Sequence, residues 1–598
     1  MKKYIIGLLL FCTVISCQPD KGIDFKPNIL WITCEDISPF LGSYGDSEAT
    51  TPNLDQLAKE GVRYTNFFAN APVCSPARFT ILHGVHASSA GTMNMRSRYK
   101  VPDEWLTYPE YLKEAGYYCT NNAKTDYNFS GNQDVWDESS QKAHYKNRAQ
   151  GQPFFAVFNF TSSHESKIHK YDSSELIHDP DKMILPSYVP DNEAMRNDMA
   201  KLYDNITKMD GQAGEILKEL DEAGLRDSTI VFYYSDHGGV FPRSKRYIHR
   251  TGTWVPLITR VPYPLQKSFG KGGSVSERLV SFVDLAPTVL SIAGVEAPDY
   301  MEGKAFMGEF IQDPQEEIFL FRNRMDERID FQRAITDGKY RYHRNFIPHR
   351  PYGQHLGYLW RAASIRSWEQ AYLNGECNEM QSRYWEEKDF EELYDMEADP
   401  WEVNNLAENE EYADVLTKMQ KRLTERMLEL NDAGALPEGL VNSVNDYTDV
   451  YSYVRDSAYP LDRVLKLSPH DYADGLLDES AVVRYWAAVF ASSDKRMTPE
   501  IKGVLFDLLD DENTEVALAA GEALYRNGHK DLGIQAVRDG MKSDNPKVVL
   551  LAFNVLEYFD DADKKLFAED VKDVQERIDS QYVNRVVEWY FSQSSASQ

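Results

Sequence analysis

Cys74 stands in a sequence context that favours a chemically active side chain. It is followed by Ser75-Pro76-Ala77-Arg78 and then by an apolar run that ends at Leu82. Proline suits the first turn of a helix, so we expect a helix to begin at Cys74. The free N–H groups and the dipole at a helix N-terminus favour an anion, and Arg78 adds a positive charge. The segment therefore suits either a bound sulfate group or an activated nucleophile.

Two acidic pairs offer ligands for a metal ion. Glu35-Asp36 and Asp236-His237 each follow a short apolar run, at residues 28–33 and 229–235, that predicts a buried strand. Carboxylate oxygens suit Ca²⁺ or Mg²⁺ better than zinc, and His237 can add a nitrogen. Near an anion-binding helix end, such a cation would withdraw charge from a sulfate ester during hydrolysis.

A thiol hydrolase is the main alternative, because a helix N-terminus also stabilises a free thiolate. The sequence indicates no Cys-His-Asn arrangement, however, whereas the acidic pairs for a hard cation are present. Besides Cys74, the chain after Cys17 has only Cys34, Cys119 and Cys377, which is too few for a disulfide scaffold. We expect Cys34 and Cys119 to be buried thiols at strand ends.

The first half of the chain alternates strand and helix patterns. A further strand is predicted at 153–160, an amphipathic helix is predicted to begin at Thr51-Pro52 in the segment 51–68, and residues 193–224 carry helical periodicity. This alternation predicts an α/β fold with a mostly parallel sheet covered on both faces. The site of such a sheet lies beyond the carboxyl ends of its strands, where both acidic pairs are expected.

The second half changes character and predicts further domains. After about residue 325 the pattern is that of a smaller α+β segment, which closes with a long helix at about 410–431. A polar stretch at 433–465 reads as a linker. We predict a signal peptide at 1–17, a catalytic domain at 27–325, a C-terminal subdomain at 326–432, this linker, and a helical domain at 466–598.

Three similar segments in the last part of the chain indicate an internal repeat. Asp478, Asp511 and Asp544 are spaced by 33 residues, and each precedes a valine and an apolar helix face. A fixed period of this kind is typical of stacked helical pairs, and the pattern resembles HEAT-type repeats. An irregular helical bundle is the alternative. Nothing in these segments looks catalytic.

The net charge and the N-terminal segment limit the possible functions and the cellular location of the protein. The net charge of −29 argues against a nucleic-acid partner, and a sulfated substrate would have to be held by a few cations in a local pocket. Lys2 and Lys3 precede an apolar run too short to span a bilayer, which ends in Val14-Ile15-Ser16-Cys17. This resembles a bacterial lipobox. It predicts an exported lipoprotein of the periplasm or cell surface, anchored only through a lipid on Cys17; an ordinary secretory signal is the alternative.

Five segments together resemble the formylglycine-dependent type I sulfatases in order and spacing, over about residues 27–430. The resemblance implies an alkaline-phosphatase-like α/β fold with a smaller α+β subdomain, an active-site Ca²⁺ rather than Mg²⁺, and a sulfated carbohydrate substrate. It also implies that a maturating enzyme converts Cys74 to formylglycine, whose hydrate attacks sulfur before a second hydroxyl helps to expel sulfate. The segments are PNILWITCEDISPFLGSYG, TPNLDQLAKEGVRYTNFF, CSPARFTILHG, SDHGG and LYDMEADPWEVNNLA.

The same resemblance assigns roles to individual residues. Arg78 would hold the formylglycine hydrate, Lys124 and Lys245 would bind the sulfate, and His164 would face the leaving group. Taken alone, His164 is typical of a satisfied core or surface histidine, and Lys245 lies in a basic run typical of a solvated face. The expected metal ligands are Glu35, Asp36, Asp236, His237 and the converted Cys74.

Two departures from the family pattern bear on mechanism. Glu35 stands where the family usually has Asp, and Asp126 where it often has the histidine of Lys-x-His. We hypothesise that Asp126 replaces this histidine as a base, with His249 as the other candidate. Arg324, Asp326, His355 and His249 are also candidates to line the substrate pocket.

The substrate is left open among several classes. Segments 188–200, 209–229 and 236–242 look most like the branch that contains the heparan N-sulfatases, but Asp126 and Ser88 depart from it at positions expected to face the pocket. An O-sulfatase acting on a marine algal glycan is one alternative, and an inactive carbohydrate-binding homologue is another. A phosphatase of the same superfamily would need a Thr or Ser nucleophile and a two-zinc ligand set, which the sequence lacks. We expect exo action, because the acidic charge disfavours a long groove for a polyanion.

Overall fold

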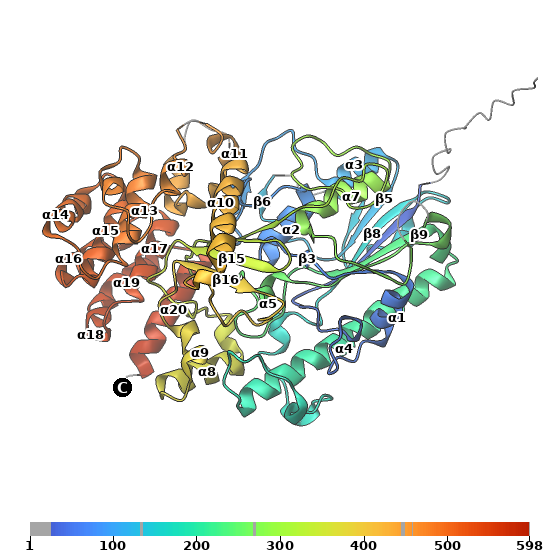
Figure 1. Ribbon diagram of the computed structural model, residues 1–598, viewed down its shortest axis with the longest axis horizontal. Coiled ribbons are helices and arrows are strands. Elements are labelled where there is room, and N and C mark those ends of the chain that lie inside the picture. Colours follow the sequence, from blue (N-terminus) through green and yellow to red (C-terminus); the bar gives the residue numbers. More distant parts are fainter. Residues whose placement is uncertain (1–25, 132–134, 267–270, 444–448, 457, 597–598) are drawn as a thin grey trace, which may run out of the picture.

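The computed structural model describes residues 26–131, 135–266, 271–443, 449–456 and 458–596. It has an α/β part with a large sheet, a smaller sheet beside it, and a helical region at the C-terminal end (Figure 1). Cys17 and the predicted signal peptide lie outside the described residues. No helix among the described residues has the length and apolar character needed to cross a membrane.

The large sheet has eight strands, in the order β11-β2-β10-β9-β1-β8-β5-β7. The run from β9 to β7 is parallel, and β10 is antiparallel to both of its neighbours. The prediction of a mostly parallel sheet is therefore confirmed. The strands are β1 (Asn28–Cys34), β2 (Val62–Tyr64), β5 (Tyr118–Asn122), β7 (Glu138–Ser139), β8 (Phe154–Phe160), β9 (Thr229–Ser235), β10 (Leu257–Arg260) and β11 (Ser274–Ser276).

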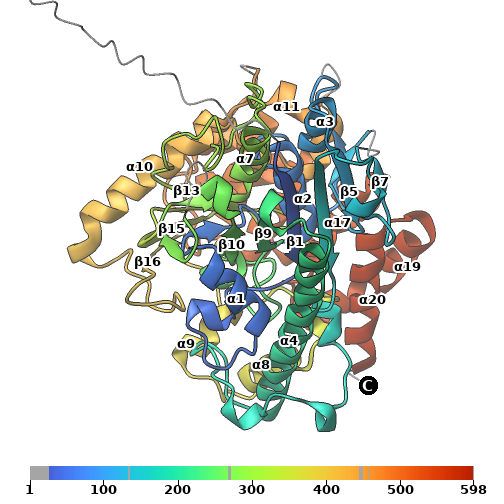
Figure 2. The ribbon, with the colours of Figure 1, turned by 90° about the vertical axis from the view of Figure 1, so that its right-hand side faces the viewer.

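Both faces of this sheet are covered because its central strands are apolar throughout. In β1, Ile29 and Trp31 pack into one hydrophobic cluster, while Leu30 and Ile32 pack into another on the opposite face. The first cluster includes side chains of α2 (Cys74–His83), α3 (Tyr108–Glu114) and α7 (Leu285–Ile292); the second includes side chains of α1 (Pro52–Glu60) and α4 (Glu193–Glu222). Figure 2 shows α4 running along its face of the sheet.

The smaller sheet is antiparallel and has the order β13-β14-β15-β16. It begins ahead of residue 326, where we placed the subdomain boundary. The long helix predicted at 410–431 is α10, which packs on β14 and β15. The elements are β13 (Ile318–Arg322), β14 (Gln332–Thr336), β15 (Tyr340–Asn345), β16 (Glu391–Asp395), α8 (Ala363–Leu373), α9 (Glu379–Ser382) and α10 (Ala413–Glu429).

The stretch expected to be a polar linker packs against its surroundings. Ala433, Leu436, Val450, Tyr459 and Val464 are all buried. Their burial explains why the stretch, although rich in polar residues, forms the short helices α11 (Val450–Tyr453) and α12 (Leu461–Val464) instead of a free connection.

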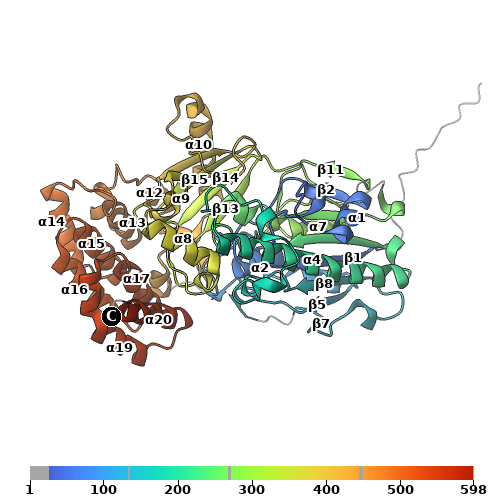
Figure 3. The same cartoon turned by 90° about the horizontal axis from the view of Figure 1, so that it is seen from below.

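The C-terminal region is helical, as predicted. Its helices α13, α15 and α17 pack on one another in turn, and each begins two or three residues after one of the periodic aspartates. Helix α20 turns back toward the α/β part and lies between that part and the rest of the region (Figure 3). The helices are α13 (Ala481–Ala491), α14 (Pro499–Asp507), α15 (Thr514–Arg526), α16 (Lys530–Met541), α17 (Pro546–Leu556), α18 (Asp561–Lys564), α19 (Ala568–Arg577) and α20 (Gln581–Ala596).

Candidate functional site

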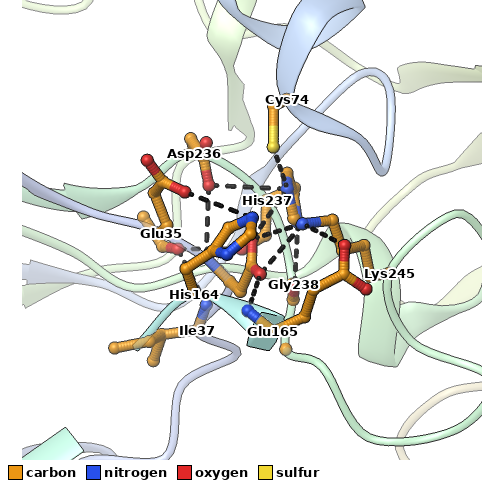
Figure 4. Close-up of polar contacts among 12 residues, drawn as sticks. Glu35, Ile37, Cys74, His164, Glu165, Asp236, His237, Gly238 and Lys245 are labelled. Atoms are coloured by element: carbon orange, nitrogen blue, oxygen red, sulfur yellow. Dashed lines mark hydrogen bonds and ion pairs between the residues drawn. The ribbon is translucent and has the colours of Figure 1, made fainter. Parts of the chain in front are cut away.

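Cys74 is the first residue of α2, as the sequence predicts. No side chain caps this helix end, so its N–H groups point toward the site with their positive dipole end. Cys74 is 3% exposed, and its Sγ lies 3.2 Å from Nε2 of His237 (Figure 4). Cys34 and Cys119, in β1 and β5, are buried free thiols as expected.

The two acidic pairs meet because β1 and β9 are neighbours in register. Cys34 pairs with Ser235, so Glu35-Asp36 and Asp236-His237 leave the sheet at the same edge. The backbone N–H of Asp36 donates to Oδ1 of Asp236 at 3.2 Å. All four side chains are buried. Donor atoms of Asp36, Cys74 and His237 lie within 4.8 Å of one another, and so do those of Glu35, Cys74 and Asp236.

The tautomer of His237 suits a cation at this position. Nδ1 lies 2.9 Å from the carbonyl of Gly238, which only accepts, so Nδ1 carries a proton. Nε2 then faces Oδ1 of Asp36 at 3.0 Å and Oδ1 of Asp236 at 3.6 Å. Burial opposes a charge on this ring, but Asp236, Cys74 and Asp36 raise the pKa of His237 well above its ordinary value, so the imidazolium can donate from Nε2 to Asp36. With a cation bound, the neutral imidazole would instead offer its Nε2 lone pair to the metal. The three carboxylates and one imidazole nitrogen fit a hard divalent cation.

Three predicted cations surround the acidic groups. Arg78 donates from Nη2 to Oδ2 of Asp236 at 2.9 Å and from Nη1 to Asn159 at 3.0 Å. Nζ of Lys124 lies 3.1 Å from Oε1 of Glu35, and Nζ of Lys245 lies 2.9 Å from Oδ2 of Asp36. The structure therefore brings Arg78, Lys124 and Lys245 to the edge of the sheet where Cys74 lies.

These ion pairs set the charge states of the buried groups. Burial alone would raise the pKa of Asp36, but Lys245, His237 and His164 outweigh it and hold that pKa well below its usual range. Burial likewise opposes the charge on Lys245, yet Asp36, Cys74 and Glu165 raise the pKa of its ammonium well above the ordinary value. Both groups are therefore charged at neutral pH.

His164 follows β8 and stays partly open to solvent, with 21% of its side chain exposed. The backbone N–H of Ser166 donates to its Nδ1 at 3.3 Å, so in the neutral ring the proton sits on Nε2. Nε2 faces the site, 3.7 Å from Oε2 of Glu35. Burial lowers the pKa of His164, which favours the neutral imidazole.

Sequence reasoning missed Glu165 and Arg246, which directly follow two predicted residues. Glu165 accepts from Lys245 at 3.0 Å and from both terminal nitrogens of Arg246 at 2.8 Å, and its backbone N–H donates to Asp36 at 2.7 Å. The only sign in the sequence that these two residues belong to the site was that they directly follow His164 and Lys245. Their burial and mutual pairing are tertiary features.

Asp126 is held by a residue that the sequence did not single out. Nε and Nη2 of Arg96 donate to its two carboxylate oxygens at 3.2 and 3.3 Å. Burial opposes its ionisation, but Arg96 with help from Ser75 and Lys124 lowers the pKa of Asp126. Asp126 is two residues from Lys124, whose ammonium pairs with Glu35, so it lies at the edge of the site.

The four candidate pocket residues separate into two groups. Asp326 accepts from Arg246 at 2.6 Å and thus joins the network around Lys245. Of the other three, Arg324 donates to the backbone carbonyl of Asp326 at 2.6 Å, whereas no contact of His249 or His355 within the described residues reaches the groups around Cys74. His249 lies with His343 and Glu392 in a separate buried cluster, Arg324 is paired with Glu438, and His355 packs on Trp360 and Trp589.

Ser88 also differs from expectation. Its side chain is fully buried, and its backbone carbonyl accepts from Ala433 at 2.9 Å. It therefore does not line an opening to solvent, because the stretch after α10 packs over it.

Unusual backbone conformations gather around the site. Asp36, Arg96, Asp126, Arg246 and Asp326 have φ between 49° and 80°, in the left-handed region that residues other than glycine rarely adopt. Such conformations persist where surrounding contacts impose them, and they cluster at functional sites. Here each of these residues takes part in one of the ion pairs described above.

Comparison with known proteins identifies the chain. Residues 27–140 and 118–295 match the family described as Sulfatase. An ulvan-active sulfatase of Formosa agariphila is 35% identical over 501 residues, 73% of this chain and 83% of that protein. The N-sulphoglucosamine sulphohydrolase of Homo sapiens is 24% identical, over 69% of this chain and 92% of that protein. A solved structure of a 2-O glycosaminoglycan sulfatase shares the fold, with a TM-score of 0.53 and 18% identity over 68% of this chain and 93% of that one.

The protein is thus a sulfuric ester hydrolase with the mixed α/β fold of the sulfatases. It belongs to the sulfatase family. About a third of the chain lies outside the match to the solved sulfatase structure.

Proposed function

We propose that the protein removes sulfate groups from a sulfated carbohydrate, with formylglycine formed from Cys74 as the nucleophile and Ca²⁺ as the cofactor. The observation that carries this proposal is the convergence of Cys74, three carboxylates and three cationic side chains at one edge of the sheet. Glu35, Asp36, Asp236, His237 and residue 74 would hold the ion. When bound, Ca²⁺ would withdraw negative charge from the sulfate oxygens.

The side chains around Cys74 can each take one task. Lys124 and Lys245 flank the acidic cluster and can donate to the oxygens of the sulfate group. Arg78, fixed by Asp236 and Asn159, can hold the hydroxyl groups of the formylglycine hydrate, whose place the Cys74 thiol occupies. The two hydroxyls of that hydrate would supply the attack on sulfur and the later expulsion of sulfate.

His164 is suited to protonate the leaving group. Its Nε2–H faces Glu35 in the site, and 21% of its side chain is exposed, so a substrate could reach it. A sugar alkoxide is a poor leaving group, so proton donation is the step in which this side chain matters most. We assign the second proton transfer, from the hydrate to a base, to Asp126 as a hypothesis, because no contact of His249 reaches the site.

Two substrate classes are supported by separate observations. The ulvan-active relative shares 35% identity over most of both chains, which favours an O-sulfated algal polysaccharide fragment. The match to N-sulphoglucosamine sulphohydrolase, over 92% of that protein, supports an N-sulfated sugar as the second candidate. We place the O-sulfated substrate first and expect exo action on oligosaccharides.

Maturation and location follow from the same proposal. Because Cys74 is 3% exposed, the maturating enzyme would have to reach it before the chain folds around it. We infer that the protein is exported and anchored through a lipid on Cys17, and that its C-terminal helices form HEAT-like repeats. The 33-residue spacing of the aspartates, each just ahead of a helix, supports the last point.

Sulfate release by the matured protein tests the proposal. The panel contains N-, 2-O-, 3-O- and 6-O-sulfated saccharides and ulvan oligosaccharides, with Cys74→Ala as the blank and the Cys74 peptide mass as the check on conversion. Release from the O-sulfated saccharides supports the first candidate, and release from N-sulfoglucosamine alone supports the second. No release by protein with converted Cys74 would favour the inactive carbohydrate-binding alternative.

A further inference from the structure

The last long helix of the chain reaches the network around the catalytic residues. Nζ of Lys245 pairs with Glu165 at 3.0 Å, and Glu165 pairs with Arg246 at 2.8 Å. Arg246 pairs with Asp326 at 2.6 Å, and Asp326 accepts from Nη1 of Arg585, in α20, at 3.0 Å. A continuous series of ion pairs therefore joins the helical region to the sulfate-binding position.

Arg585 is also linked to His164 through an aromatic ring. Its guanidinium is 5.7 Å from the ring of Tyr358, and that ring is 6.3 Å from the imidazole of His164. Tyr358 is half-buried, and 19% of the Arg585 side chain is exposed. Tyr358 therefore lies between His164, which is partly exposed, and Arg585.

A second partly exposed arginine, Arg96, pairs with Asp126. Asp126 lies at the edge of the site, and 31% of the side chain of its partner Arg96 is exposed. Burial opposes the charge on Arg96, but Asp126, with smaller effects of Tyr582 and Asp326, raises the pKa of its guanidinium above the ordinary value, so Arg96 stays charged. Tyr582 is one turn before Arg585 on α20, and the Arg585 guanidinium lies 5.4 Å from its ring. We call Arg96, Asp126, Tyr358, Tyr582 and Arg585 the rim.

The two arginines of the rim keep hydrogen-bond donors for a ligand. Arg585 uses only Nη1 for its bonds to Asp326 and Glu327, and its Nε and Nη2 make no hydrogen bond within the described part of the chain. Arg96 likewise uses Nε and Nη2 for Asp126 but not Nη1. Arg585 shares Asp326 with Arg246 and has Glu327 as a second anionic partner, but both of its bonds use the same nitrogen, which leaves the other two as donors.

The rim is cationic although the protein is acidic. The whole chain carries a formal charge of −29, yet within the described residues the rim and Lys124 together contribute three partly exposed cations, Arg96, Arg585 and Lys124, and one partly exposed carboxylate, Asp126. A guanidinium binds carboxylate or sulfate oxygens through paired N–H donors, and a tyrosine ring beside it can pack on a sugar face. The charge and the free donors of these cations therefore suit an anionic saccharide.

We propose that Arg585, together with Arg96, binds a second anionic group of the saccharide whose sulfate is cleaved at residue 74. The group is a carboxylate or a second sulfate on the same or the adjoining sugar. Helix α20 thereby makes the C-terminal helical region part of the substrate pocket and a determinant of specificity. The inference rests on the proposed function.

Matched substrates test this proposal in the full-length, matured protein. Three saccharides share one cleavable sulfate and differ only in a neutral group, a carboxylate or a second sulfate at the adjoining position. Arg585→Gln should reduce kcat/KM on at least one of the anionic saccharides by ten-fold or more relative to the neutral one, mainly through KM. The anionic saccharide that shows the larger loss identifies the group. Arg585→Lys, which keeps the charge, should restore part of the difference.

Two further measurements separate recognition from structure and from turnover. Arg577→Gln removes a cation of the same region whose partners are Met541, Ser543 and Asp544, and it should change no ratio between substrates. In the Cys74→Ala background, calorimetric binding of the anionic saccharides should weaken when Arg585→Gln is added, even if no saccharide of the panel is hydrolysed. An equal loss on all three saccharides, or unchanged binding in that background, would overturn the inference.

Discussion

Nζ of Lys124 lies 3.1 Å from Oε1 of Glu35, the residue that stands where sulfatases usually have a shorter aspartate. The same Oε1 lies 3.9 Å from Nη2 of Arg78. The longer side chain thus connects two predicted sulfate-site cations with the carboxylates beside Cys74. Glu35 therefore belongs to the cluster that we propose to hold the metal and also contacts two cations of the proposed anion site.

Replacing Glu35 by Gln should therefore weaken metal binding as well as activity. One of three negative ligands is lost, and the affinity of oxygen-ligand sites depends strongly on ligand charge. We expect the Kd for Ca²⁺ to rise on the order of ten-fold or more. The measurement is the Ca²⁺-dependent increase in Tm, which reports binding to the folded state without turnover. Glu35→Asp, which restores the usual family residue, should keep most of the increase, and an equal loss in both variants would contradict a charge effect.

Glu165→Gln should lower both stability and turnover. Glu165 is buried between Lys245 and Arg246, so its neutralisation leaves two buried cations short of a partner. Breaking a buried ion pair from one side costs about 3–5 kcal/mol, which denaturant unfolding can measure. We expect kcat to fall more than KM rises, because Lys245 loses its fixed position. Glu175→Gln, at an exposed position of a nearby loop, is the control. A stable Glu165→Gln protein with normal kcat would show that Asp36 alone positions Lys245.

His164→Gln should slow the release of sulfate from sugars more than from aryl esters. A phenolate with electron-withdrawing groups leaves without a proton, whereas a sugar alkoxide needs one. We expect a loss of about 10²–10⁴-fold in kcat on a saccharide sulfate and a much smaller loss on 4-nitrophenyl sulfate. Similar losses on the two substrates would assign His164 to sulfate binding instead.

Asp126→Asn tests the base that we assign as a hypothesis. The variant keeps the size of the side chain but removes its capacity to take a proton, so turnover should fall while Arg96 retains a hydrogen-bond acceptor. His249→Gln is the matched control, because His249 contacts His343 and Tyr352 instead of the site. Unchanged turnover in Asp126→Asn would exclude Asp126 as the base.

Acid should loosen the attachment of the helical region to the smaller sheet. Burial would raise the pKa of Glu522 in α15, but Arg350 and His349 hold it well below its usual range. A carboxylate with a lowered folded-state pKa stabilises the protein above its unfolded value of about 4.5, and this contribution is lost as the pH falls below that value. Glu522→Gln should therefore lower Tm clearly at pH 7, and the gap to wild type should shrink below about pH 4.5.

Glu512→Gln, at an exposed position just before the same helix, serves as the control for the acid experiment. It should leave Tm unchanged at each pH. A gap between wild type and Glu522→Gln that stays constant from pH 7 to about pH 4 would contradict the sign worked out from the ion pair.

Much of the large sheet and several of its helices could be predicted from the local pattern of apolar and polar residues. The predicted strands at 28–33, 153–160 and 229–235 correspond to β1, β8 and β9, and the helix at 193–224 corresponds to α4. Their long apolar runs leave few alternatives, since strands buried on both faces and amphipathic helices each have a distinct period. The start of α2 at Cys74 was predictable because Pro76 suits a first helical turn.

The sequence by itself determined which chemistry was available: a cysteine at a helix start, two acidic pairs after strands, and the cations Arg78, Lys124 and Lys245. Adjacent parallel strands bring their carboxyl ends to one edge, so the meeting of Asp36 with Asp236 followed from strand order. The predicted sulfatase family then followed from the joint occurrence of these motifs, and the comparisons confirm it.

Only the tertiary structure decided what surrounds these residues. His249 and Lys245 are four positions apart, yet one lies in a separate cluster and the other in the site, because the segment between them changes direction at Arg246, where φ is 80°. Arg585 is some 340 positions from Lys245, and no local period could indicate that α20 turns back to Asp326. Contacts between distant segments depend on how whole helices and strands pack. The sequence pattern predicts the individual helices and strands, but not which distant residues their packing brings together.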